Sequence, residues 1–301
     1  MEATFDTAYP RPRLIKGHWQ ILSGGWTLNG SPIRVPYPPQ AALSGYAGEV
    51  PEALTYRKHC QLSTGNPYPA GRLLLHFGAV DQIAEVFING SSVCRHEGGY
   101  TPFTADITPL LSGRDFDLCL EVLDRLDSRY PYGKQCKKRG GMWYTPVSGI
   151  WQTVWCEWVP NVYIQNVNVL TTETTARIQV QMSQPTEEEA QISLNIDGIR
   201  HTFTTTGHEL TIDLSRFHQP IPWCCENPHL YPFTIRCCGD EAESYFGLRR
   251  ISIEQVEGFS RICLNGKPVF LNGVLDQGYF QQGLFLPETP EEYDRDILRM
   301  K

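Results

Sequence analysis

Hydrophobic and polar residues alternate along most of this chain, which is the period-two pattern of half-buried β-strands. The clearest alternating runs lie at 53–62, 72–77, 83–90 and 116–123. The third run ends in Asn-Gly, the pair that most strongly indicates a two-residue hairpin turn, and residues 91–95 follow as the return strand. No run before residue 289 has helical periodicity. Strands at this spacing, separated by turn residues, predict a β-sandwich.

Residues 140–160 form the most aromatic stretch, with four of the seven tryptophans between Trp143 and Trp158. The second half of the stretch alternates, and large side chains stand on both faces of the predicted strand. This pattern is typical of a strand that is covered on both sides in a sandwich core. The first half is glycine-rich and predicts a loop, and Pro160 ends the strand. We therefore expect one domain to end and the next to begin here.

Residues 161–257 are less aromatic and contain thinner strands rich in Thr, Val, Ile and Gln. Seven short runs alternate between polar and apolar side chains, at 163–171, 176–182, 190–197, 201–206, 209–214, 230–238 and 243–246. Seven short strands in about a hundred residues is the count of an immunoglobulin-like sandwich.

The last segment of the chain has a different pattern. The apolar run 270–275 predicts a buried strand, and residues 289–301 predict a helix with Thr289 as N-cap and Pro290 at the first helical position. One strand and one helix cannot bury their own apolar faces. We therefore expect residues 259–301 to be mobile or to depend on contacts with other molecules. Because the chain ends within the helix, we also expect it to be part of a longer protein.

Composition and charge narrow the classes of function. The net charge is −7 and no basic stripe is present, so nucleic acid is not expected as a partner. The sequence has no apolar run long enough for a membrane span and no signal peptide at its start, which predicts a cytoplasmic protein. Of the ten cysteines, two adjacent pairs lack the spacing of zinc ligands and three others sit in apolar strand-like runs. We expect no metal, no cofactor and no disulfide.

Short motifs that follow one another in order are similar to those of one known family. They are Val-Pro-Tyr-Pro at 35–38, Tyr-Arg-Lys at 56–58, His-Phe-Gly-Ala-Val-Asp at 76–81, Val-Phe-Ile-Asn-Gly at 86–90, His-Glu-Gly-Gly-Tyr-Thr-Pro-Phe at 96–103, Gly-Lys-Gln at 133–135 and Val-Ser-Gly-Ile-Trp-Gln-Thr-Val at 147–154. As a set they resemble the N-terminal sugar-binding domain of family 2 glycoside hydrolases, the β-galactosidase and β-glucuronidase group. Residues 265–274 resemble the beginning of that family's catalytic barrel.

The resemblance implies three parts. They are a jelly-roll sugar-binding domain at 1–160, an immunoglobulin-like β-sandwich at 161–257, and the start of a truncated (β/α)8 TIM barrel at 258–301. The expected fold class is therefore all-β, with a single βα unit at the end.

The resemblance also implies a reaction. Members of the family are retaining glycosidases that use two glutamates about 5 Å apart. In the family both glutamates lie on later barrel strands, so we expect this chain to lack them and to be inactive alone. The implied partner is a β-glycoside or oligosaccharide bound through the parent enzyme, and a homo-oligomer is compatible with the sequence.

Two residues near the barrel start are predicted to contact substrate in the parent enzyme. Asp276 and Gln277 follow the first predicted barrel strand, and active sites of such barrels gather at the C-terminal ends of strands. By the resemblance, relatives carry a basic residue and a sugar-contacting histidine at these two places. The alternative is a pair that only stabilises its loop.

Trp143 and Tyr144 are the second pair of predicted substrate contacts. They lie on the loop before the aromatic strand, and in relatives this loop contributes an acidic sugar contact. No acid stands at the matching place here, but an aromatic ring could stack on the apolar face of a sugar. The alternative is packing between domains.

Other polar residues are assigned structural roles. Asp81 and Asp106 lie at predicted turns, where aspartate closes hydrogen bonds to nearby backbone. His76 and His96 have no second ligand or nucleophile at a recognisable spacing. Two further functions stay open beside the glycosidase: a free-standing carbohydrate-binding module that uses the two aromatic loop residues, and a purely structural or oligomerisation domain.

Overall fold

The computed structural model describes residues 8–138 and 140–301. By its contacts the chain divides into two compact units. The first contains residues 8–10, His18–Trp158 and Leu275–Lys301, and the second contains Arg11–Gly17 and Val159–Val274. The division after Trp158 lies beside the boundary predicted at residue 160. The predicted barrel segment 258–301 is shared between the two units.

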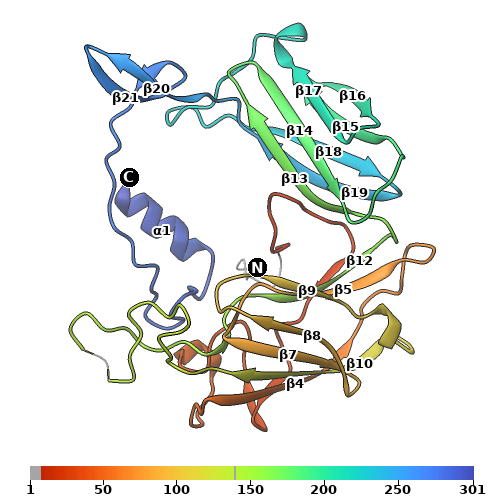
Figure 1. Cartoon of the computed structure of the whole chain (residues 1–301), viewed down its shortest axis with the longest axis vertical. Coiled ribbons are helices and arrows are strands. Elements are labelled where there is room, and N and C mark those ends of the chain that lie inside the picture. Colours follow the sequence, from red (N-terminus) through yellow and green to blue (C-terminus); the bar gives the residue numbers. More distant parts are fainter. Residues whose placement is uncertain (1–7, 139) are drawn as a thin grey trace. The chain divides into compact units, whose positions relative to one another are not determined.

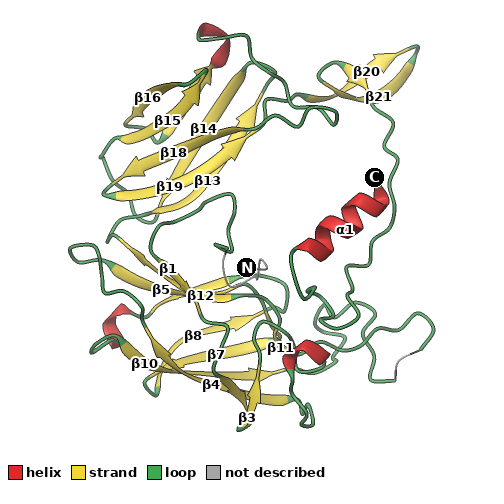
Figure 2. Cartoon of the chain, turned by 180° about the vertical axis from the view of Figure 1, so that it is seen from behind, coloured by secondary structure: helices red, strands yellow, loops and turns green. Residues whose placement is uncertain are grey.

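The first unit is built on two antiparallel sheets (Figures 1 and 2). The larger sheet has the order β3(Ser31–Ile33), β2(Trp26–Leu28), β4(Ala53–Gln61), β10(Asp115–Leu123), β7(Ile83–Ile88), β8(Ser91–Glu97). The smaller sheet has the order β1(Trp19–Ile21), β12(Val154–Val159), β5(Arg72–Phe77), β9(Phe103–Asp106). A short pair, β6(Val80–Asp81) and β11(Gly149–Ile150), joins the region before β12 to the region before β7.

The core of the first unit follows directly from the alternation in its sequence. On β10 the even-numbered residues are buried, and they pack with buried residues of β4, β5 and β7. Tyr56 is fully buried at the centre, with its ring edge-on to Trp26 at 6.3 Å. The predicted hairpin is confirmed, because Asn89 and Gly90 both have positive φ, 50° and 82°, between β7 and β8.

The aromatic strand predicted near residue 154 is β12, and it is covered on both faces as expected. One face contributes Val154 and Cys156 to the main core. On the other face Trp155 stacks on His76 with ring centroids 4.7 Å apart. Glu157, also buried, lies with its Oε1 3.1 Å from His76 Nε2. His76 is thus part of the packing around β12.

The second unit contains all seven strands predicted for it. One sheet has the order β13(Ile164–Thr171), β14(Thr175–Met182), β17(Glu209–Asp213), and the other has the order β16(Ile199–Thr205), β15(Ala190–Ile196), β18(Tyr231–Cys237), β19(Asp240–Phe246). Their apolar faces share one core. The segment Arg11–Gly17 belongs to this unit: Ile15 pairs with Glu243 at the free edge of β19, and Lys16 forms a buried ion pair with Asp240.

The C-terminal part corrects two predictions. Residues 270–275 form no strand, and Phe270 is 89% exposed. A single barrel strand has no neighbours to satisfy its backbone or cover its side chains, so the apolar run is not a sufficient signal. The helix α1(Glu291–Met300) is present but has no buried residues, and Thr289 does not cap it. The Thr289 side chain instead bonds the Glu291 carboxylate and lowers the pKa of that group.

Three strands precede that segment in the second unit, β20(Ile251–Val256), β21(Phe259–Leu264) and β22(Lys267–Pro268). Short 3₁₀ turns occur as η1(Ala42–Ser44), η2(Thr108–Leu110) and η3(Leu214–Arg216). None of the helices in the described part of the chain is long and apolar enough to cross a membrane.

A glycine substitution tests the core of the first unit. Gly149 has a φ of 69°, and a Cβ there would lie 2.2 Å from the Tyr56 hydroxyl oxygen. Gly90 has a similar φ but open space around it. We expect Gly149→Ala to lower the free energy of unfolding by about 3 kcal/mol, from backbone strain and overpacking together, and Gly90→Ala by about 1 kcal/mol from strain alone.

Urea unfolding followed by tryptophan fluorescence measures this difference, since six of the seven tryptophans lie in the first unit. Equal losses for the two variants would contradict the packing of Tyr56 against Gly149.

Candidate functional site

The loop between β10 and β11 carries Trp143 and Tyr144. A turn closes where the Trp143 N–H donates to the Gly140 carbonyl at 3.2 Å. The backbone of Tyr144 is then held by two further hydrogen bonds, from its own N–H to the Lys134 carbonyl at 3.0 Å and to its carbonyl from the Cys136 N–H at 3.1 Å. The Tyr144 side chain is therefore carried on fixed backbone, while Trp143 beside it is 48% exposed.

Gln135 anchors the same loop from inside. Its side chain is buried, its amide nitrogen donates to the Tyr100 hydroxyl at 2.9 Å, and its amide oxygen accepts from the Val147 N–H at 2.6 Å. The sequence motif at 133–135 contains this glutamine, but its local sequence pattern does not predict that its side chain is buried and bonded to two other residues.

Tyr144 and Gln277 are in direct contact. The Tyr144 hydroxyl donates to the Gln277 amide oxygen at 2.8 Å, and the Tyr144 ring stacks on Tyr279 with centroids 4.7 Å apart and planes 12° from parallel. Two of the four predicted site residues, 133 positions apart in the chain, are thus brought together. The amide nitrogen of Gln277 is a second polar group of this side chain and can donate hydrogen bonds.

An aromatic row within the first unit continues from this contact through Tyr144, Tyr279, Phe285, Trp151 and Tyr100. Neighbouring ring centroids are 4.7, 5.2, 5.0 and 5.8 Å apart. The Trp151 indole N–H donates to the Gly99 carbonyl at 2.7 Å. Each ring is positioned by its neighbours, so the row connects the exposed end of the site to the buried scaffold.

Segment 275–288 is held to the rest of the first unit by polar and apolar contacts. The Tyr37 hydroxyl donates to the Pro287 carbonyl at 2.9 Å, and the Leu43 N–H donates to the Gln282 carbonyl at 3.0 Å. Leu286 is buried in a small cluster with Tyr37 and Ala41. Tyr37 lies in the motif at 35–38, yet its partner is 250 residues away and could not be found from local pattern.

Asp276 occupies a turn beside Gln277. Its Oδ1 accepts from the Gly278 N–H at 2.8 Å, and Gly278 has a φ of 65° that favours glycine. Both Asp276 and Gln277 are exposed. Trp143 lies outside the aromatic row.

Behind the aromatic row two carboxyl groups are desolvated. Asp81 is only 3% exposed and lies beneath Gly99, where a Cβ would be 2.3 Å from its Oδ1. Burial raises the pKa of Asp81 to about 7, and the nearby charge of Asp124 adds to this. Burial also raises the pKa of Asp124, against the effect of a hydrogen bond from Ser148. Asp81 is therefore a buried residue of strand β6, not the turn residue that the sequence predicted.

The remaining predicted structural residues behave as expected. Asp106 accepts from the Thr108 N–H at 3.0 Å and from its hydroxyl at 2.6 Å, which closes a turn. His96 stacks on Phe103 at 4.4 Å, and its Nε2 lies 3.1 Å from the Thr101 hydroxyl. Across residues 8–138 and 140–301, no three His, Cys, Asp or Glu side chains gather as metal ligands.

The exposed part of the site combines hydroxyl, amide and carboxylate groups with flat aromatic faces. Gln277 can donate and accept, Asp276 can accept, and the rings of Trp143 and Tyr279 offer apolar surfaces. This combination suits a hydroxyl-rich ligand. It offers no activated nucleophile.

Removing the Tyr144 hydroxyl tests how segment 275–288 is held. We expect Tyr144→Phe to keep the ring stack, lose one hydrogen bond and speed hydrogen exchange of amides in this segment about two- to tenfold. Tyr144→Ala loses the stack as well, and exchange should be faster again.

Deuterium uptake of peptides covering 275–288, read by mass spectrometry, measures the effect. Tyr130→Phe, a hydroxyl on the same loop that does not bond Gln277, is the control and should leave uptake unchanged. Equal uptake in Tyr144→Ala and the unaltered protein would show that the contact does not hold the segment.

The pKa of Asp81 predicts a pH dependence of stability. Because the pKa is higher in the folded state, near 7, than its ordinary value of 3.8, the folded state binds the proton more tightly. The resulting stabilisation is complete below about pH 4 and is lost as the pH rises through 7. Asp81→Asn, which resembles the protonated acid, should match the unaltered protein near pH 4 and exceed it by roughly 2–4 kcal/mol at pH 8.

Unfolding free energies from pH 4 to pH 8 measure this difference. Asp213→Asn is the contrasting control, because hydrogen bonds from Ser215 lower the pKa of Asp213. Its stability difference should therefore stay constant above pH 5. A constant difference for Asp81→Asn as well would contradict the buried position of the carboxyl group.

Comparison with known families and proteins accounts for most of the chain. Residues 22–160 match the family model described as glycosyl hydrolases family 2, sugar binding domain, and residues 162–249 match the model described as glycosyl hydrolases family 2. A β-galactosidase of Thermoanaerobacter pseudethanolicus is 24% identical over 260 residues, which is 81% of this chain and 34% of the relative. A β-glucuronidase of Rattus norvegicus is 26% identical over 234 residues, which is 67% of this chain and 35% of the relative.

Solved structures share the fold. The crystal structure of a Ruminococcus gnavus β-glucuronidase superposes with a TM-score of 0.72 at 18% identity, covering 100% of this chain and 55% of that one. The chain spans about a third of the length of the curated relatives it matches, 34% and 35% in the two cases above. With two consecutive family models matched and the fold shared, this chain belongs to the family 2 glycosyl hydrolases, as its motifs indicate.

Proposed function

We propose that this chain is the N-terminal, non-catalytic part of a retaining β-glycosidase of the β-galactosidase or β-glucuronidase type. In this proposal the first unit is a jelly-roll sugar-binding domain and the second an immunoglobulin-like sandwich. Residues 258–301 begin a (β/α)8 barrel. Support comes from the two-sheet topology of each unit, from the two family models in sequence, and from the named relatives.

The observation that carries the proposal is the contact between Tyr144 and Gln277. It attaches the loop of the first unit to the segment at the proposed barrel start, through one hydrogen bond of 2.8 Å and the stack on Tyr279. In a barrel enzyme the loops after the strands surround the substrate. The contact would therefore place Trp143, Tyr144, Asp276 and Gln277 at the rim of the substrate mouth.

The chemistry of the parent reaction is assigned to residues outside this chain. A retaining mechanism needs two carboxyl groups about 5–5.5 Å apart, one as acid/base and one as nucleophile, on either side of the scissile bond. Asp81 has a pKa suited to an acid, about 7, but it is buried beneath Gly99 and cannot reach a substrate. Asp276 is exposed, and its role in the proposal is to accept hydrogen bonds from sugar hydroxyls.

A free-standing carbohydrate-binding module is the second candidate. The observation that favours it is the exposure of Trp143 at 48% beside the exposed Met142, since such a surface can stack on a sugar without any barrel. The partner would again be a β-glycoside or oligosaccharide. The cytoplasmic location and any homo-oligomer remain predictions from the sequence.

The coding sequence downstream of Lys301 separates the two candidates. The glycosidase predicts about 250 further codons, the size of a (β/α)8 barrel, with two glutamates at strand ends. A stop codon directly after Lys301 would favour the binding module.

If the gene continues, the kinetics of the longer protein then test whether Gln277 contacts the substrate. We expect Gln277→Ala to lower kcat/KM for 4-nitrophenyl β-D-galactoside or β-D-glucuronide about two- to tenfold, the effect of one lost hydrogen bond. Gln191→Ala, on an exposed strand position of the second unit, is the control and should leave kcat/KM unchanged. The 301-residue chain alone should release no nitrophenol. Release by that chain, or no effect of Gln277→Ala, would contradict the proposal.

A further inference from the structure

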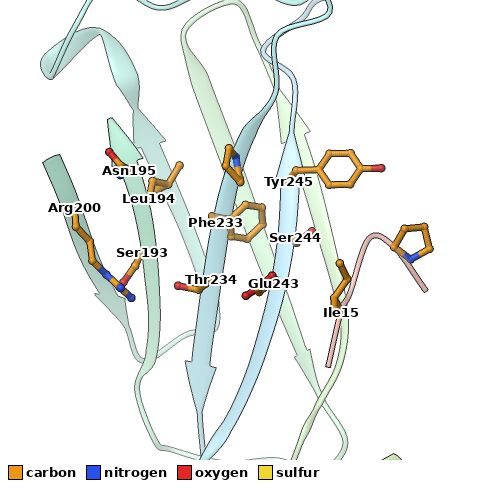
Figure 3. Close-up of a pocket in the computed structure, with 12 residues that line it drawn as sticks. Ile15, Ser193, Leu194, Asn195, Arg200, Phe233, Thr234, Glu243, Ser244 and Tyr245 are labelled. Atoms are coloured by element: carbon orange, nitrogen blue, oxygen red, sulfur yellow. The ribbon is translucent and has the colours of Figure 1, made fainter. Parts of the chain in front are cut away.

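A groove of about 410 Å³ lies on the outer face of the β16-β15-β18-β19 sheet in the second unit (Figure 3). We call it the outer groove. Its volume falls within the range of about 300–1,000 Å³ found for small-molecule sites. All of its lining residues belong to the second unit, so it is separate from the Tyr144–Gln277 contact in the first.

The surface of the outer groove is mostly apolar, and strand alternation places a few polar side chains within it. On β15, Ile192 and Leu194 point into the core, while Ser193 and Asn195 point outward. Thr234 on β18 stands opposite Ser193 in the sheet register, so hydroxyl groups lie side by side across neighbouring strands. Hydroxyl and amide groups can both donate and accept hydrogen bonds, which matches the hydroxyls of a sugar.

One wall of the outer groove is flat and apolar. Tyr245 on β19 is 37% exposed and stands opposite Pro232 in the register, and its ring extends toward the side where Arg11–Gly17 lies (Figure 3). That segment adds Pro12 and Ile15 to the lining. The wall is rigid, because Ile15 exchanges two backbone hydrogen bonds with Glu243, at 2.9 and 3.0 Å. Aromatic and proline faces suit the apolar C–H face of a pyranose.

The charges of the outer groove are balanced. Arg200 on β16 and Glu243 on β19 line opposite sides, and in the described part of the chain neither side chain has an ion pair or hydrogen-bond partner. The guanidinium offers five donors in a planar fork and the carboxylate offers acceptors only. One positive and one negative group give no net attraction to a polyanion. Both can bind pairs of neighbouring hydroxyls.

From this combination we infer that the outer groove binds a neutral oligosaccharide as an accessory site, separate from the substrate mouth. Sugar rings would lie against Tyr245 and Pro232, and their hydroxyls would bond to Ser193, Thr234, Arg200 and Glu243. A peptide added as a strand is disfavoured near Glu243 of β19, since Ile15 already pairs with that residue. The inference does not require catalytic activity in this chain.

Calorimetric titration of the 301-residue protein tests this site. The neutral probes are β-1,4-galactotetraose and cellotetraose, and tetragalacturonate is the charged comparison. We expect one or both neutral probes to bind, and Tyr245→Ala to weaken that binding about tenfold. Arg200→Ala should weaken it severalfold. Both side chains are exposed, and far-UV circular dichroism checks that the variants stay folded.

Two controls locate the binding. Arg236→Ala removes an arginine that pairs with Glu241 on the same sheet but does not line the outer groove, and Tyr144→Ala alters the substrate-mouth residues in the first unit. Arg236→Ala should leave the affinity unchanged, and Tyr144→Ala should weaken binding less than Tyr245→Ala does. The inference is overturned if no neutral probe binds at millimolar concentration, if tetragalacturonate binds more tightly than both neutral probes, or if Tyr144→Ala rather than Tyr245→Ala abolishes binding. Loss in Tyr144→Ala alone would still agree with the proposed function, so the two proposals fail separately.

Discussion

The carboxylate of Glu157 is buried on strand β12, and its negative charge has to be balanced within the protein. His76 on β5 lies 3.1 Å away, and the Tyr9 hydroxyl donates a hydrogen bond to the same carboxylate. Removing one partner of such a buried group typically costs about 3–5 kcal/mol, because the remaining charge stays desolvated. A one-residue shift of β12 would turn Glu157 toward the apolar core that Val154 now faces. The buried charge therefore fixes the register of β12.

The register of β12 in turn positions the residues that precede it. Gly149 lies against the Tyr56 ring, and Trp151 donates from its indole to the Gly99 carbonyl at 2.7 Å. Trp151 is a member of the aromatic row, whose rings pass through Phe285 to Tyr144. The exposed edge of the candidate site is consequently set by packing that begins inside the first sandwich. Because packing within the first unit holds these residues, the candidate site does not require residues 270–279 to form a helix or strand.

Sequence pattern predicts the sandwiches better than it predicts the site. Strand alternation depends only on near neighbours in the chain, so all seven strands of the second unit could be found in advance. Gln135 and Tyr37 form hydrogen bonds to residues that only the tertiary fold brings near them, and the partner of Tyr37 is 250 residues away in the sequence. No local sequence pattern marks either residue. The burial of Asp81 was missed for the same reason. Gln277 and Tyr144 were predicted as site residues only because the motifs around them resemble a known family, and their contact with each other was not predicted.

The uneven covering of apolar side chains is a second physical argument for the proposed function. On the hairpin β20–β21, Ile253 is 77% exposed, and Phe259 and Ile251 are also largely exposed. Burying an aliphatic or aromatic side chain of this size contributes about 1.5–3 kcal/mol. The described residues, 8–138 and 140–301, do not bury these side chains, so that stabilisation is not realised among them. The exposed run 270–275, which failed as a strand, belongs to the same stretch. In the proposed function, a barrel that begins at residue 258 would supply neighbours for that run and would cover the hairpin, so one missing partner would account for both exposed features.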